Sequence, residues 1–255
     1  MRQQVVAKIK PAAGFAHLFH LSLVVVLPLI LYILVRAFPV DFFQLALILV
    51  LLSKWRMFAV RPRYWPANLR ANGIDIIVAI ATITFMSPAH SHTIFWELTW
   101  AVVYGAWLVG LKPRSDVLSV SLQALLGQLF GLMALFLAGA SAPLYVLVLG
   151  SGAICYLAAR HFFDSFEEGY SRLLAYAWGY FGAALTWLLG HWLLFYGVLA
   201  QPTLLLTVIG YGLAALYYFD HYDRLSKLLQ RQFVLVMIAI VVVVLALSNW
   251  GDKII

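Results

Sequence analysis

Three side chains between residues 161 and 168 have the types and the spacing of metal ligands. His161, Asp164 and Glu168 are separated by three and four positions, which places them on one face if the segment is a continuous helix. Imidazole and carboxylate groups bind divalent metal ions, and Asp220 and His221 could complete the ligand set from a neighbouring loop. The alternative is a group of solvated loop acids paired with nearby arginines. The sequence therefore permits a divalent metal site, and no other cofactor is predicted.

A basic and aromatic segment, residues 54–73, could bind lipid headgroups. It interleaves cations with aromatic rings, and this mixture suits the bilayer interface, where each arginine attracts anionic headgroups by about 1 kcal/mol. Guanidinium groups could also bind a lipid phosphate through paired hydrogen bonds. The alternative is an interfacial anchor without a ligand. The headgroup candidates are Arg56, Arg61, Arg63, Arg70 and Trp65.

Polar side chains inside apolar runs mark a possible substrate path. A carboxylate several residues inside a membrane span is costly unless it is paired or hydrated, so Glu97 should face the interior of the bundle. The same argument applies to Asp75, although this residue could simply cap a helix. The path candidates are Glu97, Asp75, Gln123, Gln128 and His191.

Two further histidines, His90 and His92, precede Glu97 in the sequence. Together with His191 they have the ligand types of a zinc or copper site, or of a proton relay. The alternative is that they are isolated loop histidines without a common ligand.

A stripe of polar and small residues runs along the predicted span at 116–138. Asp116, Ser119, Gln123, Gly127 and Gly131 follow one another at offsets of three and four. The Gly-x-x-x-Gly spacing lets a second helix approach closely, and Gln123 could hydrogen-bond across the contact. We expect the stripe to join helices rather than to line a solute path. Gly127 and Gly131 could also serve a homo-oligomer or a partner subunit.

Composition predicts that the elements holding these residues are membrane spans. The 255 residues are 64% hydrophobic and 11% charged, and their mean hydropathy is +0.94, whereas soluble domains are about half apolar and a quarter charged. We expect one all-α integral membrane domain over residues 1–255, with a cytoplasmic segment at 1–16. The formal charge of +7 lies in short loops rather than on one face, so no nucleic-acid partner is expected.

Apolar runs and their Pro, Gly and charged breakers predict about nine spans, each needing about 20 apolar residues. The run at 41–53 is short enough to be tilted or re-entrant, and the first run is expected to be an uncleaved span rather than a signal peptide. The predicted spans are 17–36, 40–53, 74–88, 92–111, 116–138, 142–159, 172–197, 202–219 and 232–249.

The loop charges predict the orientation of these spans. With the amino terminus inside, 15 of the 17 Lys and Arg residues face the cytoplasm, and only Arg36 and Lys253 face outward. Dropping one span would reverse every later loop. We therefore predict nine spans with the carboxyl terminus outside. Separately, the two halves of the sequence show no internal repeat, so symmetry does not indicate a transporter site.

Several catalytic signatures are missing from the sequence. Leu149-Gly150-Ser151-Gly152 lacks the first glycine of the rhomboid-protease serine motif, and no Lys lies deep in a late span as in retinal proteins. No His-x-x-His-His cluster and no Walker motif is present. The single cysteine, Cys155, excludes an intrachain disulfide. An enzyme is therefore not the leading interpretation.

Two segments carry a resemblance to a known group of proteins. Lys54-Trp-Arg-Met-Phe-Ala-Val-Arg-Pro-Arg-Tyr-Trp-Pro-Ala-Asn and Gly190-His-Trp-Leu-Leu-Phe-Tyr-Gly resemble segments of uncharacterised multi-span proteins from ultra-small, Saccharibacteria-type bacteria. The resemblance extends along most of the chain and implies a bacterial cytoplasmic membrane, but no active site. Nine spans with an inner amino terminus also resemble the aromatic prenyltransferases in topology alone, because the Asn-Asp-x-x-Asp motif of that family is missing.

Three functions remain open from the sequence. The leading hypothesis is a non-enzymatic bundle that moves a small solute or a lipid, or that serves as the membrane subunit of a complex. The second is an intramembrane enzyme acting on a lipid phosphate, with residues 54–73 and the acids near 161–168 and 220–223. The third is a structural scaffold. Membrane lipids with anionic headgroups in the inner leaflet are the expected partners.

Overall fold

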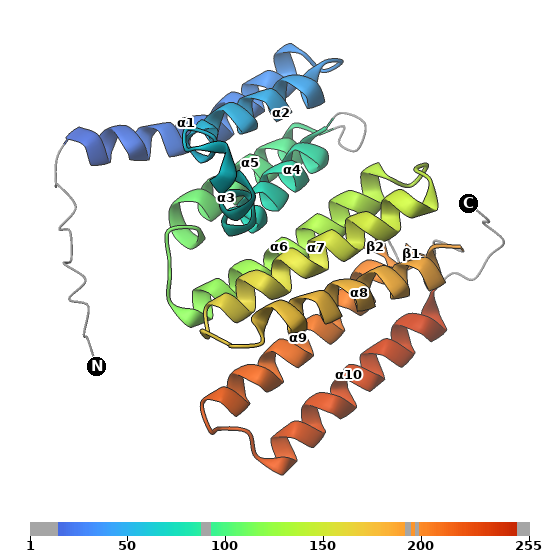
Figure 1. The fold of residues 1–255 in the computed structure, drawn as a ribbon. Helices are drawn as coiled ribbons and strands as arrows, with labels where there is room; N and C mark the ends of the chain where they lie inside the picture. Colours follow the sequence, from blue (N-terminus) through green and yellow to red (C-terminus); the bar gives the residue numbers. More distant parts are fainter. Residues whose placement is uncertain (1–14, 88–92, 192–194, 197–198, 249–255) are drawn as a thin grey trace, which may run out of the picture.

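The computed structural model describes residues 15–87, 93–191, 195–196 and 199–248, and only the backbone of residues 15–24, 56, 195 and 196. It confirms the prediction of an all-helical fold (Figure 1). The ten α-helices of the described chain are α1 (Phe15–Ala37), α2 (Phe42–Ser53), α3 (Trp65–Ala71), α4 (Gly73–Met86), α5 (Ile94–Ala106), α6 (Val117–Ala138), α7 (Leu144–Asp164), α8 (Ser171–Gly190), α9 (Gln201–His221) and α10 (Lys227–Leu247). The shorter turns are η1 (Trp55–Met57), η2 (Pro62–Tyr64) and η3 (Trp107–Leu111), of which the last is a π-helical continuation of α5.

Six helices of the described chain are long and apolar enough to cross a membrane, so the protein is a multi-pass membrane protein by length and composition. They are α5 with η3, and α6 to α10. A seventh span arises if residues Pro62–Ala71 and α4, which are bent by 68° at their junction, form one crossing. The side chains of α1 are described only from Val25 onward, and α2 has 12 residues, so neither is counted among these six. The count of nine spans stays a prediction.

The predicted span at 172–197 differs from the structure at its end. Helix α8 ends at Gly190, and β1 (Phe195–Tyr196) then pairs antiparallel with β2 (Leu199–Ala200). Pro202 occupies the first turn of α9, where its missing amide hydrogen costs no helical hydrogen bond. The chain therefore reverses through a short hairpin before it enters the next helix.

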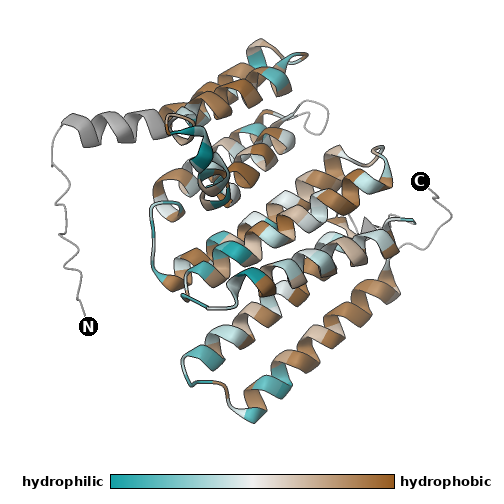
Figure 2. Ribbon diagram, in the orientation of Figure 1, coloured by the Kyte–Doolittle hydropathy of each residue, from teal (hydrophilic) through white to brown (hydrophobic). Residues whose placement is uncertain are grey.

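Polar residues gather at the two ends of the bundle, and apolar residues cover the middle (Figure 2). The long helices run in alternate directions (Figure 1), so segments 54–72, 112–116, 165–170 and 222–226 lie at one end. We call this end the basic end, since most Lys and Arg residues of the described chain lie there. It corresponds to the side that the loop charges predict to be cytoplasmic.

Helix α4 forms the centre of the bundle, and eleven of its fourteen residues are buried. It packs on α6 across Gly127 and Gly131. A Cβ atom at Gly127 would lie 2.7 Å from Cγ2 of Ile74, and one at Gly131 would lie 2.5 Å from Cγ2 of Ile77. The Gly-x-x-x-Gly spacing thus brings α4 and α6 together within one chain, as expected for tight helix pairs. The binding of a second copy or a partner subunit through Gly127 and Gly131 stays a prediction.

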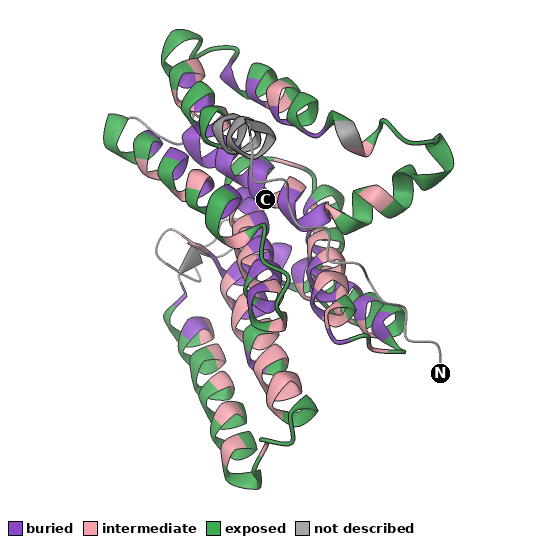
Figure 3. Ribbon diagram, turned by 90° about the vertical axis from the view of Figure 1, so that its left-hand side faces the viewer, coloured by how far each residue is buried: buried purple, intermediate pink, exposed green. Residues whose placement is uncertain are grey.

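Buried residues gather in the middle of the bundle (Figure 3), and the last helix, α10, contributes almost none of them. Helices α7 and α8 form a tight pair, whereas α8 and α9 touch far less. In α10 only Val244 is buried, and this helix packs on α9. Because α10 is apolar along most of its length, its exposed sides suit contact with lipid. The loose packing around α9 leaves room for the cavity described next.

Candidate functional site

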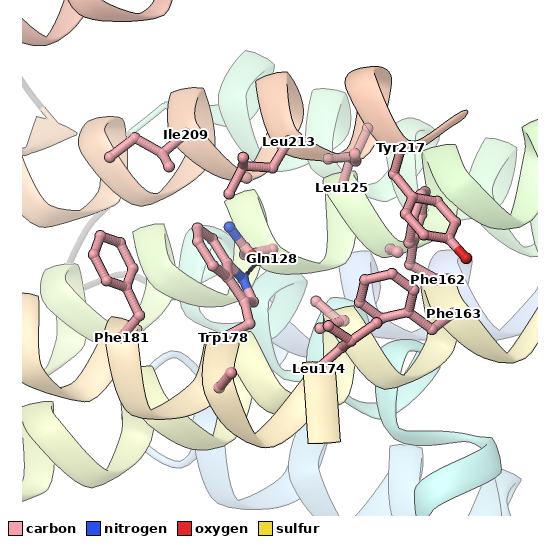
Figure 4. A pocket seen from close by; sticks show the side chains of 16 residues that line it. Leu125, Gln128, Phe162, Phe163, Leu174, Trp178, Phe181, Ile209, Leu213 and Tyr217 are labelled. Atoms are coloured by element: carbon pink, nitrogen blue, oxygen red, sulfur yellow. Dashed lines mark hydrogen bonds between the residues drawn. The ribbon is translucent and has the colours of Figure 1, made fainter. Parts of the chain in front are cut away.

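A cavity of about 510 Å³ lies between α6, α7, α8 and α9 (Figure 4). Its walls are almost entirely leucine, phenylalanine, isoleucine and alanine side chains, among them Leu125, Phe162, Leu174, Phe181 and Leu213. The volume falls within the range of about 300–1,000 Å³ that is common for small-ligand sites. An apolar cavity of this kind favours a hydrocarbon ligand over a polar solute.

One polar corner interrupts these apolar walls. The Trp178 indole N–H donates to Oε1 of Gln128 at 2.9 Å, and Nε2 of Gln128 donates to the Leu206 carbonyl at 3.0 Å. A Cβ atom at Gly210 would lie 2.9 Å from Nε2 of Gln128, so glycine is what lets this amide reach α9. Gln128, predicted as part of a substrate path, therefore does line a cavity, but its amide is bonded to neighbouring helices.

A second apolar crevice of about 380 Å³ lies on the other side of α9, between α6, α9 and α10. Leu125 lines both spaces, and Tyr211, Phe233 and Met237 belong to the second alone. Helix α9 is thus flanked by two apolar spaces and is held mainly by α6 and α10. Each contact that α9 makes with a neighbouring helix is therefore less extensive than the contact between α7 and α8.

Tyr217 lines the cavity near the basic end and bonds a loop carboxylate. Its hydroxyl donates to Oε2 of Glu168 at 2.5 Å, and the Tyr170 amide donates to Oε1 at 3.3 Å. These bonds stabilise the ionised carboxylate and lower the pKa of Glu168 from its ordinary value, with the Tyr217 bond as the largest cause. Aromatic rings of Phe166 and His221 pack against Tyr217.

We expect Tyr217→Phe to raise the pKa of Glu168 toward the value of a free glutamate, because the strongest bond to its carboxylate is lost. The depressed pKa contributes stability above the unfolded-state pKa, and this contribution is lost as the pH falls through the folded-state pKa. Titration of a carbon-labelled Glu168 by NMR measures the shift. Tyr218→Phe is the matched control, and an equal shift in both variants would contradict the assignment.

His161 and Gln123, predicted as a metal ligand and a path residue, bond each other. Nε2 of Gln123 donates to the carbonyls of Leu111 and Arg114 at 2.8 and 2.9 Å. Its Oε1 must therefore accept the hydrogen bond from Nε2 of His161, at 2.9 Å. The bond from His161 ties α7 to α6, and the two bonds from Nε2 tie α6 to the turn after η3, so the amide is fully engaged by the protein.

The predicted metal ligands do not gather around one point. Within the residues that the structure describes, no three His, Cys, Asp or Glu side chains lie close enough to share a metal ion. Helix α7 ends at Asp164, which is paired with Arg160 at 3.0 Å, so Glu168 does not continue the helical face. Asp220 and His221 form the end of α9. The metal site stays a prediction that no contact here supports.

Asp75 is the centre of a buried ion network at the basic end. Its Oδ2 atom accepts hydrogen bonds from the ammonium groups of Lys54 and Lys112, the latter at 2.7 Å. Its Oδ1 atom accepts from the Trp107 indole at 3.2 Å. We call these four residues the Asp75 network. It joins the end of α2, the start of α4 and the end of η3.

The lysines of this network differ in exposure. The Lys54 side chain is 7% exposed and that of Lys112 is 41% exposed. Burial lowers the pKa of Lys54 from its ordinary value, and the charge of Lys112 lowers it further, whereas Asp75 opposes the shift. Lys54 therefore depends on Asp75 for its charge, while Lys112 can also reach water.

Glu97 lies at the opposite end of the bundle, in the first turn of α5, and is buried as predicted. Arg36, from the last turn of α1, pairs with it at 2.8 Å. Nδ1 of His191 is 2.8 Å from the Trp187 carbonyl. His90 and His92 lie outside the described residues, so the predicted zinc, copper or relay site at this end stays a prediction.

The basic aromatic segment forms η1, η2 and α3, and Arg61, Arg63 and Arg70 are exposed, whereas Lys54 at its start is buried. The Arg63 guanidinium lies over the Tyr64 ring at 4.6 Å, and Trp65 donates to the Val60 carbonyl at 3.0 Å. Arg70 donates to the Pro66 carbonyl at 3.3 Å. Arg61 is exposed, and the side chain of Arg56 lies outside the described residues. These contacts are local, which suits an interfacial segment.

No protein-family model, curated protein or solved structure matches this chain. The candidate sites therefore depend on geometry alone. Sequence reasoning missed Lys54, Lys112 and Trp107 as partners of Asp75, since it interpreted the lysines as topology signals. One signal could have indicated the two lysines: both directly follow apolar runs and lie on the same predicted side of the membrane as Asp75.

Proposed function

We propose that this protein binds the hydrocarbon part of a membrane lipid in the cavity between α6 and α9, and that it moves this lipid within the bilayer without enzymatic chemistry. The single observation that carries the proposal is the apolar cavity of about 510 Å³ among helices that are long enough to cross a membrane. Lipid tails are the abundant apolar ligands at that depth.

The polar residues of the bundle favour a lipid over a small polar solute. Gln123 and Gln128 are engaged by backbone and side-chain groups of neighbouring segments. Asp75 and Glu97 are ion-paired at opposite ends of the bundle. A polar solute would need donors or acceptors along a continuous path, and the cavity walls offer few.

The proposal includes a location and a topology. We place the protein in the cytoplasmic membrane of a bacterium, with nine spans and the basic end facing the cytoplasm. The positive-inside distribution of Lys and Arg supports the orientation, and the resemblance to Saccharibacteria-type proteins supports the location. The short helix α2, with 12 residues, would then cross a locally thinned bilayer.

A photolabelling experiment tests lipid binding in the cavity. Leu174 lines the cavity, whereas the neighbouring Leu173 points outward and is 66% exposed. We expect Leu174→Trp to fill the space and to reduce labelling of α6–α9 peptides by an acyl-chain diazirine lipid by about tenfold, or ~1.4 kcal/mol. Leu173→Trp adds the same ring to the lipid-facing side and should leave the labelling unchanged.

Lipid movement is measured separately with the same two variants. Purified protein in vesicles should accelerate the exchange of a fluorescent phospholipid between leaflets, and Leu174→Trp should remove the acceleration while Leu173→Trp retains it. Equal labelling of both variants would refute the binding site. Loss of labelling without any lipid exchange would leave a lipid-binding protein and refute the transport role.

A further inference from the structure

The Asp75 network holds more positive than negative charge. Two ammonium groups bond the same carboxylate oxygen, and the other oxygen is occupied by the neutral Trp107 indole. Lys54 and Lys112 thus share one carboxylate, which leaves one positive charge in excess. In the part of the chain that the structure describes, neither lysine is ion-paired with a second acid.

The network also has hydrogen-bond donors beyond those that Asp75 uses. An ammonium group has three N–H donors, and the hydrogen bond from the buried Lys54 ammonium to Asp75 accounts for one of them. Three residues before Trp107, Tyr104 of α5 is fully buried, and its hydroxyl has no hydrogen-bond partner within the part of the chain that the structure describes. Buried donors without acceptors are rare in folded proteins.

The position of the network suits a ligand from the headgroup layer. Lys54 follows the last residue of α2, Lys112 follows η3, and Asp75 lies in the first turn of α4. All three are therefore at the basic end, where spans meet the interface. Because the Lys112 side chain is 41% exposed, the network is reached from outside the bundle. The exposed basic segment that begins at Trp55 adds positive potential beside it.

We propose that the Asp75 network binds a phosphate oxyanion through the ammonium groups of Lys54 and Lys112, with Asp75 holding the two lysines in place. Two ammonium groups held together are typical donors for phosphate, and such charge-assisted bonds are strong in a partly dry site. A lipid phosphate and a soluble phosphate share this chemistry. The site is separate from the α6–α9 cavity and does not depend on lipid transport.

The two lysines allow a test in which the fold is retained. Lys54→Gln and Lys112→Gln each leave one lysine paired with Asp75. The variant network then has no net charge and no unpaired buried acid, so the fold should be retained. Arg63→Gln is the matched control, since it removes the same charge from the exposed segment of the same end. Protein in phosphatidylcholine nanodiscs is compared with protein in nanodiscs that also contain phosphatidic acid, and protein in detergent is titrated with inorganic phosphate.

The thermal unfolding midpoint is the readout, because a ligand that binds the folded state raises it. We expect phosphatidic acid or inorganic phosphate to raise the wild-type midpoint, and each lysine variant to need about tenfold more anion for the same rise. A rise with the lipid alone identifies a headgroup, and a rise with both probes identifies phosphate in general. If neither probe raises the unfolding midpoint of the wild-type protein, the proposal is overturned. The proposal is also overturned if the lysine variants respond to the anion like the wild type, or if Arg63→Gln weakens the response instead.

Discussion

Asp75→Asn is expected to lower the free energy of unfolding by about 3 kcal/mol, because it leaves the Lys54 ammonium buried without its carboxylate. The loss should lie at the lower end of the range for broken buried ion pairs, since Lys112 is partly exposed and can turn to water. Reversible unfolding in bicelles, followed by tryptophan fluorescence, measures the change.

A second substitution separates charge from packing in this prediction. Lys54→Met in the Asp75→Asn background removes the unpaired charge and should restore at least half of the lost stability. Glu97→Gln is the matched single control at the opposite end, and it should cost less because its partner Arg36 is 41% exposed. If Asp75→Asn unfolds like wild type, Lys54 is not held by this carboxylate.

The sequence predicts the helices well because hydropathy and chain breakers are local properties. Each predicted span falls on a helix of the described chain, although six helices alone meet the length and hydropathy of a full crossing. The burial of Asp75 and Glu97 also follows from local physics, since a carboxylate inside a span needs a partner. Each carboxylate is paired with a cation at or directly after the end of another helix.

Contacts between distant segments could not be predicted in the same way. Lys54 is 21 residues from Asp75, and no spacing rule connects a helix end to the start of another helix. The grouping of His161, Asp164 and Glu168 assumed a helix that continues, but the chain turns after Asp164 and Glu167 adopts a positive φ of 54°. The turn places Glu168 beside Tyr217 instead.

The cavity is the least predictable feature, because its walls have the composition of lipid-facing helices. Leu173 and Leu174 are adjacent in sequence, yet one faces outward and the other lines the cavity. Hydropathy cannot separate an apolar wall from an apolar exterior in a membrane, where both contact hydrocarbon. Only the packing of four helices, and the separation of α9 from α8, creates the space.

The closest helix pair provides the second large prediction. A Cβ atom at Gly182 would lie 2.6 Å from Sγ and 3.0 Å from Cβ of Cys155, so α7 and α8 meet here without room for a side chain. We expect Gly182→Val to lower the free energy of unfolding by about 3 kcal/mol through overpacking. The same bicelle unfolding measures it. Ala184→Val, on the exposed face of α8, should change stability by less than about 0.5 kcal/mol.

A double substitution tests whether the sulfur atom is the cause. Gly182→Ala alone forces the new methyl group against Sγ, and Cys155→Ala alone leaves a small void, so each single variant should be less stable than wild type. Combined, the methyl group enters the space that the sulfur leaves, and the loss should be smaller than the sum of the two single losses. Additive losses would mean that a methyl group at position 182 does not contact the Cys155 sulfur across the α7–α8 interface.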